Sequence, residues 1–165
     1  MSLKIKQIDW SRDREQLLDI ARSAFRDIAS DERDLLTQLE RGFGFIAFNN
    51  SQPTGYIIAI PLEKAPYRGC AEDESTGRLD TAYIESLAVK EGSSPATLLG
   101  LTRKLGNEFE SKGYRRMTMH VESDSKLHKA LINLGAKQLE DFDNWMGWGR
   151  TFSYLEMPLD EQPDK

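Results

Sequence analysis

The segment that decides the fold runs from Ala82 to Leu101 and reads AYIESLAVKEGSSPATLLGL. Its first half is the most strand-like stretch of the chain, and its second half repeats leucines at helical spacing. A short loop of small residues, Gly92 to Ser94, joins the two halves. Ser94 suits a helix N-cap, and Pro95 suits the first helical position. The segment therefore predicts a buried strand that turns directly into a long helix.

The loop before this helix has two interpretations. Backbone amides and the positive end of the helix dipole attract phosphate groups, and small side chains let a ligand approach the backbone. A capped turn from strand into helix, which every α/β protein needs, explains the same residues. Neither a Walker-type G-x-x-x-x-G-K-[ST] motif nor a G-x-G-x-x-G motif is present. The local sequence by itself favours the capped turn.

Outward from this segment, hydrophobic periodicity predicts the remaining elements. Alternating residues predict strands over 3–8, 43–50, 54–62, 114–122 and 148–159, with a weaker one over 136–142. Helical spacing predicts helices over 9–25, with Phe25 on its apolar face, and over 30–42, 94–113 and 124–135. Caps are expected at Ser11 or Asp13 and at Ser30 or Asp31. Residues 49–55 carry Asn, Pro and Gly at hairpin-turn spacing, and Glu63 to Arg78 reads as one long loop.

This order of elements predicts an α+β fold. Strands are consecutive in the middle of the chain, and helices cross over between the later strands, so we expect a sheet of mixed direction with helices on both faces. The 165 residues suit one domain, which we place at 1–159. The polar tail over 160–165 is expected to be disordered.

The composition excludes several classes of function. The net charge of -5 argues against nucleic acid or an anionic membrane as the main partner. The single cysteine, Cys70, cannot form an internal disulfide, which fits a reducing cytoplasm. No apolar run is long enough for a membrane span, and the first residues do not form a signal peptide. No Cys/His cluster has metal-ligand spacing, so we expect no metal.

Three segments resemble the GNAT superfamily of acyl-CoA-dependent N-acyltransferases. Residues 82–90 are similar to the family's central strand, which precedes its pyrophosphate loop. Residues 94–121 have the length and pattern of the helix and strand that follow. Residues 124–142 resemble the family's late signature, an amphipathic helix that ends in glycine. The resemblance implies a mostly antiparallel central sheet flanked by helices, and a cofactor that is acetyl-CoA or another short acyl-CoA.

The resemblance also implies where the cofactor lies. Its pantetheine arm would pair with the backbone of Leu87 and Val89, and its pyrophosphate would lie at the loop. The implied cofactor-binding residues are Leu87, Ala88, Val89, Gly92, Ser93, Ser94, Ala96, Thr97 and Asp124.

The loop departs from the family's [QR]-x-x-G-x-[GA] pattern. In the closest register only Ala96 fits, and Glu91 stands where the family often has a cation. The family's tyrosine on the last helix would fall at Leu131, and Asp124 stands where asparagine is frequent. The fold is therefore better supported than the activity.

Amine attack needs a residue that removes a proton, because a lysine-like amine is almost wholly protonated at pH 7. Glu85, in the middle of an apolar strand, is the first candidate for a general base, and a solvent-facing strand residue is the other interpretation. His120 is a weaker catalytic candidate, since a structural histidine is more common. Tyr154 or water is a candidate acid for the leaving thiolate. His128 is expected at the surface.

These observations predict transfer of an acetyl group from acetyl-CoA directly to a primary amine of a small molecule or peptide. The alternative is a catalytically inactive protein of the same fold that binds a ligand or a protein partner. Trp145, Trp148 and Phe152 fit an acceptor pocket, strand packing or a homodimer contact equally well. The acidic run over 71–76 fits a basic acceptor, or more simply a solvated loop.

Overall fold

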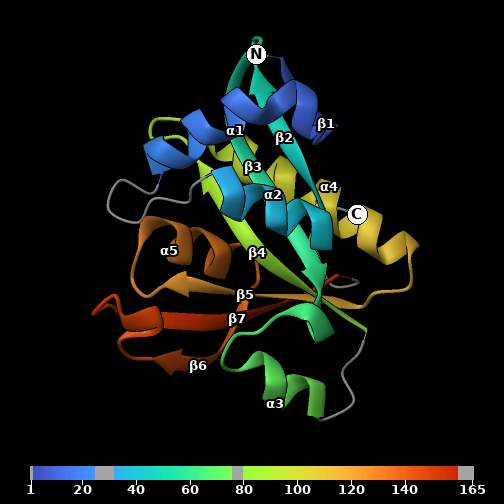
Figure 1. Cartoon of the computed structure of the whole chain (residues 1–165). Coiled ribbons are helices and arrows are strands. Elements are labelled where there is room, and N and C mark those ends of the chain that lie inside the picture. The colour runs from blue at the N-terminus through green and yellow to red at the C-terminus, as the bar shows by residue number, and fades with distance from the viewer. Residues whose placement is uncertain (1, 25–31, 76–79, 160–165) are drawn as a thin grey trace. The chain divides into compact units, whose positions relative to one another are not determined.

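The computed structural model describes residues 2–24, 32–75 and 80–159, and its helices and strands are labelled in Figure 1. In chain order they are β1 (Leu3–Gln7), α1 (Trp10–Ala24), α2 (Glu32–Arg41), β2 (Phe43–Asn49), β3 (Gln52–Pro61), η1 (Leu62–Lys64), α3 (Cys70–Ser75), β4 (Thr81–Val89), α4 (Pro95–Ser111), β5 (Arg116–Glu122), α5 (Lys126–Asn133), β6 (Lys137–Phe142), η2 (Trp145–Gly147) and β7 (Phe152–Pro158). The predicted positions of Phe25, Ser30 and Asp31 and the tail over 160–165 lie outside the described residues.

The strands pair in the order β1-β2-β3-β4-β5-β7-β6. The pairs β1–β2, β2–β3, β5–β7 and β6–β7 are antiparallel, whereas β4 and β5 are parallel. This confirms the predicted α+β class and the mixed direction of the sheet. The chain forms two compact units: unit 1 is 1–60 with 85–108, and unit 2 is 61–84 with 109–165. The placement of a single domain over 1–159 stays a prediction.

In unit 1, helices cover both faces of the sheet. Successive strand residues point to opposite faces, so the neighbours Gly55 and Tyr56 in β3 mark the two sides. Tyr56 is fully buried in a cluster with α1 and α2. The members of that cluster are Leu17, Leu18, Ile20, Ala21, Leu35, Ile46, Tyr56, Ile58 and Ala88. On the other side, the position that a Cβ of Gly55 would take lies 3.1 Å from Leu101 of α4.

In unit 2, β5 is the first of three adjacent strands in the order β5-β7-β6. It pairs with β7 from Arg116–Pro158 to Glu122–Phe152, and β7 pairs with β6 on its other side. Figure 1 shows β5, β7 and β6 side by side in the orange-to-red part of the chain. The first four residues of β4, Thr81 to Ile84, pair with β5 in parallel. The weaker strand expected over 136–142 is therefore present as β6.

The hairpin of β2 and β3 is confirmed, but its turn is shorter than the sequence suggests. Asn50 and Ser51 have φ values of 51° and 68°, the left-handed conformation that tight two-residue hairpin turns require. Pro53, expected in the turn, lies in β3 opposite Phe48, where the register shifts after Ala47. Proline is tolerated there because a bulge interrupts the ladder of backbone hydrogen bonds.

The loop expected between Glu63 and Arg78 is wrong for its described part. The chain forms the 3-10 helix η1 and the short helix α3 there. Glu72 accepts the amide of Gly69 at 2.9 Å, which satisfies a donor just before α3. The acidic sequence hid this helix because, over its described side chains from Cys70 to Asp73, only Cys70 is deeply buried.

Cys70 is an inert core residue. Burial raises the pKa of the Cys70 thiol to about 12, so the nucleophilic thiolate is strongly disfavoured near neutral pH.

The last helix corrects the position expected for His128. Ser125 is the N-cap of α5 and accepts the amide of His128 at 3.0 Å. The His128 ring is buried because both of its nitrogens have partners: Nδ1 accepts the amide of Asp124 at 3.2 Å, and Nε2 contacts Oε1 of Gln138 at 3.0 Å. His128 therefore ties α5 to β6 and does not lie on the surface.

Across the described ranges, no helix has both the length and the apolar character to cross a bilayer.

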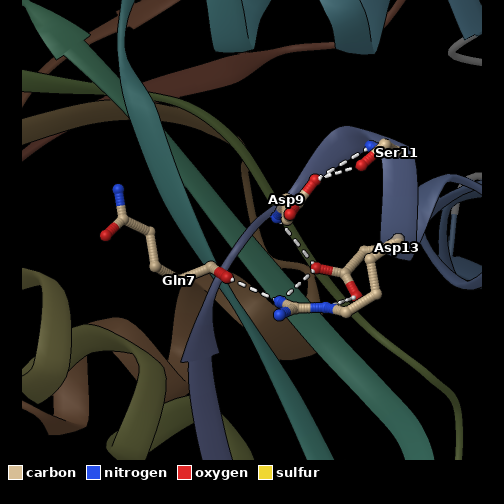
Figure 2. A network of polar contacts seen from close by, with 5 residues as sticks. Gln7, Asp9, Ser11 and Asp13 are labelled. Carbon is tan, nitrogen blue, oxygen red and sulfur yellow. Dashed lines mark hydrogen bonds and ion pairs between the residues drawn. The ribbon is translucent and has the colours of Figure 1, made fainter.

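The start of α1 differs from the expected cap. The helix begins at Trp10, so Asp9 is the N-cap, and the prediction of Ser11 or Asp13 is wrong. Figure 2 shows Asp9 accepting both the amide and the hydroxyl of Ser11, at 3.1 and 2.7 Å. Asp13 reaches back to accept the amide of Asp9 at 2.9 Å and pairs with Arg12 at 2.8 Å. The two carboxylates thereby satisfy the donors at this helix end reciprocally.

Asp13 is expected to link the stability of the protein to acid pH. Burial by itself raises the pKa of Asp13, but hydrogen bonds from Arg12 and from the Asp9 amide outweigh it, and the net shift is downward. The stabilisation is therefore present above the unfolded pKa of about 3.9 and is lost as pH falls through the folded pKa. We expect Asp13→Asn to lower the free energy of unfolding at pH 7 by about 2 kcal/mol and to weaken the acid dependence below about pH 4.

Urea unfolding at several pH values measures both effects. The control is Glu15→Gln, which neutralises an exposed carboxylate on the same helix. Equal losses in the two variants would contradict the assignment.

Candidate functional site

β4 passes into α4 through the predicted capped turn. Ser94 is the N-cap: its hydroxyl oxygen accepts the Ala96 amide at 3.2 Å, and its carbonyl accepts the Thr97 amide at 2.9 Å. The loop is closed by the Ser93 amide, which donates to the Lys90 carbonyl at 3.1 Å. The N-cap role that the sequence gives to Ser94 is confirmed.

The outer side of this loop is open. Gly92 has a φ of 81°, and no atom lies within 4 Å of the position that a Cβ would take there. Gly92 and Ala96 are exposed, and Ser93 and Ser94 are half-buried. Among the described residues no acceptor is present for the amides of Gly92 and Ser94. Two amide donors beside a helix N-terminus suit an anion.

Other residues implied for the cofactor face inward. Thr97 is buried, and its hydroxyl lies 3.5 Å from that of Thr54 in β3. Leu87 and Ala88 are also buried. These three residues can offer a ligand only their main chain, which is the role the resemblance implies for Leu87.

The charges of the loop do not favour an anion. Glu91 is exposed, and the ammonium group of Lys90 is engaged by Asp19 of α1. The loop therefore places an exposed carboxylate near its open side while its neighbouring cation is held elsewhere. The loop therefore lacks the positive charge that the family's [QR] position often supplies, and it has the negative charge of Glu91 there.

The side chain of Glu85 is buried beside an arginine. Its side chain is 1% exposed, and its Oε1 forms an ion pair with the guanidinium of Arg41 at the end of α2. The residue as a whole is half-buried, so the part of Glu85 that reaches the surface is main chain. The interpretation of Glu85 as a solvent-facing strand residue is wrong.

His120 has both ring nitrogens in hydrogen bonds. Nε2 lies 2.7 Å from the carbonyl of Arg68, which can only accept, so Nε2 carries the proton. Nδ1 then accepts from the hydroxyl of Tyr83 at 2.6 Å. Burial lowers the pKa of His120 to about 4, so the ring is neutral at pH 7. This geometry supports a structural role.

Tyr154 is also committed to internal partners. Its hydroxyl donates to Asp73 at 2.7 Å and lies 2.8 Å from Thr118. Burial raises the pKa of Tyr154 further above its ordinary value, which makes proton loss harder. Both properties disfavour it as a proton donor to a thiolate.

The predicted site residues divide between the two units. Glu85 and every implied residue from Leu87 to Thr97 belong to unit 1, whereas His120, Asp124 and Tyr154 belong to unit 2. Asp124 is exposed, with a φ of 62°, and its amide is held by His128.

Sequence reasoning missed the partners of these residues. Arg41 lies 44 positions before Glu85, and nothing in either segment signals their pairing. The sequence could have indicated Tyr83 as a residue near the candidate site, because Tyr83 shares a face of the predicted strand with Glu85. Arg68 could not, since it falls in a stretch read as a loop.

Comparisons with known proteins support the fold. No protein-family model matches the chain, and no curated protein matches it in sequence. Solved structures match it along nearly its whole length. The ribosomal-protein-S18-alanine N-acetyltransferase from Escherichia coli has a TM-score of 0.74 at 16% identity, with 96% of this chain and 94% of that chain covered.

Two further structures are similar in the same way. The aminoglycoside 6'-N-acetyltransferase from Enterococcus faecium has a TM-score of 0.68 at 18% identity, covering 98% of this chain and 99% of that one. A chain of the NatC complex bound to Gag peptide and CoA has a TM-score of 0.71 at 17% identity, covering 96% and 99%. At these identities the likeness is one of fold.

Proposed function

We propose that this chain, whose fold is that of the GNAT N-acetyltransferases, is an enzyme that moves an acetyl group from acetyl-CoA directly to a primary amine. The observation that carries the proposal is the open, glycine-containing turn between β4 and α4. It lies in a chain that shares its fold end to end with N-acetyltransferases.

The residues of this turn fit the pyrophosphate of CoA. The amides of Gly92 and Ser94 and the N-terminus of α4 supply donors and a positive dipole. The absent side chain at Gly92 leaves room for a bulky group. The main chain of Glu85, Leu87 and Val89 would hold the extended arm of the cofactor through strand-like hydrogen bonds.

Glu85 is the proposed general base. When bound, acetyl-CoA supplies an activated acetyl thioester, from which the CoA thiol leaves. Because its side chain is buried, Glu85 would take a proton from the ammonium group of the acceptor through a water molecule, so that the neutral nitrogen can attack the acetyl carbon. Arg41 holds the carboxylate in place. Because Tyr154 is buried and hydrogen-bonded, solvent water is the proposed source of the proton that neutralises the leaving thiolate.

Two measurements test this proposal. Acetyl-CoA at millimolar concentration is expected to raise the melting temperature, because a ligand that binds only the folded state stabilises it. Release of CoA thiol with a panel of amines then reports acetyl transfer. A melting temperature that neither acetyl-CoA nor CoA raises would contradict the enzyme proposal.

The second candidate is an inactive protein of the same fold that binds a ligand or partner. It is favoured by the exposed Glu91, by the engagement of Lys90 with Asp19, and by Leu131 in place of the family's tyrosine. Stabilisation by CoA without acetyl transfer to any amine would support this candidate over the enzyme.

Glu91 is expected to weaken CoA binding. A carboxylate beside the pyrophosphate repels it, so Glu91→Gln should lower the Kd for CoA about threefold to fivefold at low salt. The gain should shrink at high salt, because exposed charges are screened. Calorimetric titration measures both.

Glu108→Gln is the matched control for this prediction. It removes the same charge from within α4, more than three turns from the start of that helix at Pro95 and away from the loop that holds Glu91. A similar gain in this control would assign the effect to net charge and not to the loop.

A further inference from the structure

A pocket of about 380 Å³ lies in unit 2 between two short segments. Its walls are Pro66, Tyr67 and Arg68 from one segment and Asn144, Trp145, Met146 and Gly147 from the other. The volume falls in the range typical of small-ligand sites. None of the residues discussed for the cofactor lines it.

The inner wall of the pocket is a packed aromatic cluster. Trp145 stacks on His120 with ring centroids 4.0 Å apart, and Tyr67 stacks on Tyr83 at 5.3 Å. Trp145 is almost completely buried and makes this wall rigid, and the half-buried Tyr67 supplies accessible aromatic surface. A flat apolar group suits such a wall.

Two residues at the rim of the pocket have a strained backbone conformation. Asn144 and Met146 have φ values of 48° and 53°, the left-handed region that side chains other than glycine rarely adopt. Met146 is 56% exposed, so burial of its own side chain does not explain the strain. Strained residues of this kind cluster at ligand sites.

Arg68 supplies a charge at the mouth of the pocket. Its guanidinium lies over the rings of Phe142 and Trp145, at 5.1 and 5.7 Å from their centroids. Stacking uses the faces of the guanidinium and leaves the N–H groups at its edge available. To the described residues it makes one hydrogen bond, which is long, 3.4 Å to the carbonyl of Asp143.

The main-chain carbonyl of Arg68 is fixed by a hydrogen bond from His120. The half-buried ring of His120 donates to the Arg68 carbonyl at 2.7 Å, and Tyr83 donates to the same ring at 2.6 Å. The arginine therefore combines a fixed backbone with an exposed, weakly bonded fork. Such a fork matches a carboxylate bidentately.

We infer that this pocket binds a flat apolar molecule that carries a carboxylate, with Arg68 on the carboxylate and the aromatic wall on the apolar body. The further statement that this molecule is the acetyl acceptor rests on the proposed function. An amine with both features is a free aromatic amino acid. The pocket and its ligand stand independently of the transfer reaction.

The binding test compares L-phenylalanine with phenethylamine, which lacks only the carboxylate. NMR titration without acetyl-CoA should show tighter binding of phenylalanine to the wild type. Arg68→Gln should raise the Kd for phenylalanine about tenfold or more, as expected for loss of a charge-assisted pair. It should leave the Kd for phenethylamine unchanged.

Two variants make the result specific. Arg115→Gln removes an exposed arginine of the same unit and should change neither Kd. Arg68→Lys keeps the charge but loses the fork, so it should give an intermediate Kd. Equal affinity of the wild type for the two probes, or an unchanged phenylalanine Kd in Arg68→Gln, would overturn the inference.

A turnover assay with acetyl-CoA separates this inference from the proposed function. Phenylalanine should have a lower KM than phenethylamine, and Arg68→Gln should remove the difference. Acetyl transfer that ignores the carboxylate overturns the inference and leaves the proposed function standing. Binding of phenylalanine through Arg68 with no transfer to any amine supports the pocket and overturns the proposed function.

Discussion

Replacing Glu85 by glutamine is expected to lower kcat/KM for acetyl transfer at pH 7 by a factor of about 10² to 10⁴. Glutamine keeps the size of the side chain and cannot accept the proton of an ammonium group. The loss should shrink as pH rises toward about 10, because the acceptor then loses its proton to solvent. A pH series of initial rates, wild type against variant, measures this directly.

The ion pair with Arg41 offers the contrary explanation, in which Glu85 only stabilises the fold. Arg41→Gln is the matched variant, since it breaks the same pair from the other side. If the pair is structural, both variants lose similar unfolding free energy and similar activity. If Glu85 is the base, Glu85→Gln loses far more activity than Arg41→Gln at comparable stability, and only its deficit depends on pH.

Gly42→Ala is expected to be the most destabilising of the substitutions considered. A Cβ at Gly42 would lie 1.9 Å from the carbonyl oxygen of Ala59, a backbone atom that cannot move without disturbing β3. Overpacking of this kind costs about 3 kcal/mol. Urea unfolding measures the loss.

Gly92→Ala provides the contrast. The left-handed φ of Gly92 costs a side chain about 1 kcal/mol, but nothing stands in its way. A loss in Gly42→Ala no larger than in Gly92→Ala would show that β3 yields to the added methyl group. The position matters for the site as well, because Gly42 directly follows Arg41 and its close approach to β3 fixes where the partner of Glu85 emerges.

Many helices and strands of this fold can be predicted because the residues that specify them are close together in the sequence. The cap at Ser94, the helix α4 and the hairpin of β2 and β3 follow from residues within a few positions of one another. The GNAT fold inferred from the segment around β4 is confirmed. The missed elements are those whose burial comes from distant segments: α3 is acidic along its length, and Asp9 caps α1 only because Asp13 returns the bond.

The candidate site was less predictable for the same reason. The sequence indicates Glu85 as a candidate general base because it is a carboxylate in the middle of an apolar strand, but nothing in the sequence indicates its partner Arg41. The structural role of His120 depends on hydrogen bonds with the carbonyl of Arg68 and the hydroxyl of Tyr83, two residues that are distant from it in the sequence. The assignments of Glu85, of the loop residues and of Asp124 stay predictions until ligand binding and turnover are measured.

The interleaving of the two units has a consequence for synthesis on the ribosome. Unit 1 needs residues 85–108, so β3 has neither its neighbour β4 nor the covering helix α4 when the first 60 residues are complete. At roughly 5–20 residues per second, translation leaves this gap open for about 2 to 10 s. During that interval the β2–β3 hairpin exposes one apolar face and an unpaired edge, the features that promote aggregation. The nascent chain is therefore most prone to aggregation before residues 82–101 have been translated.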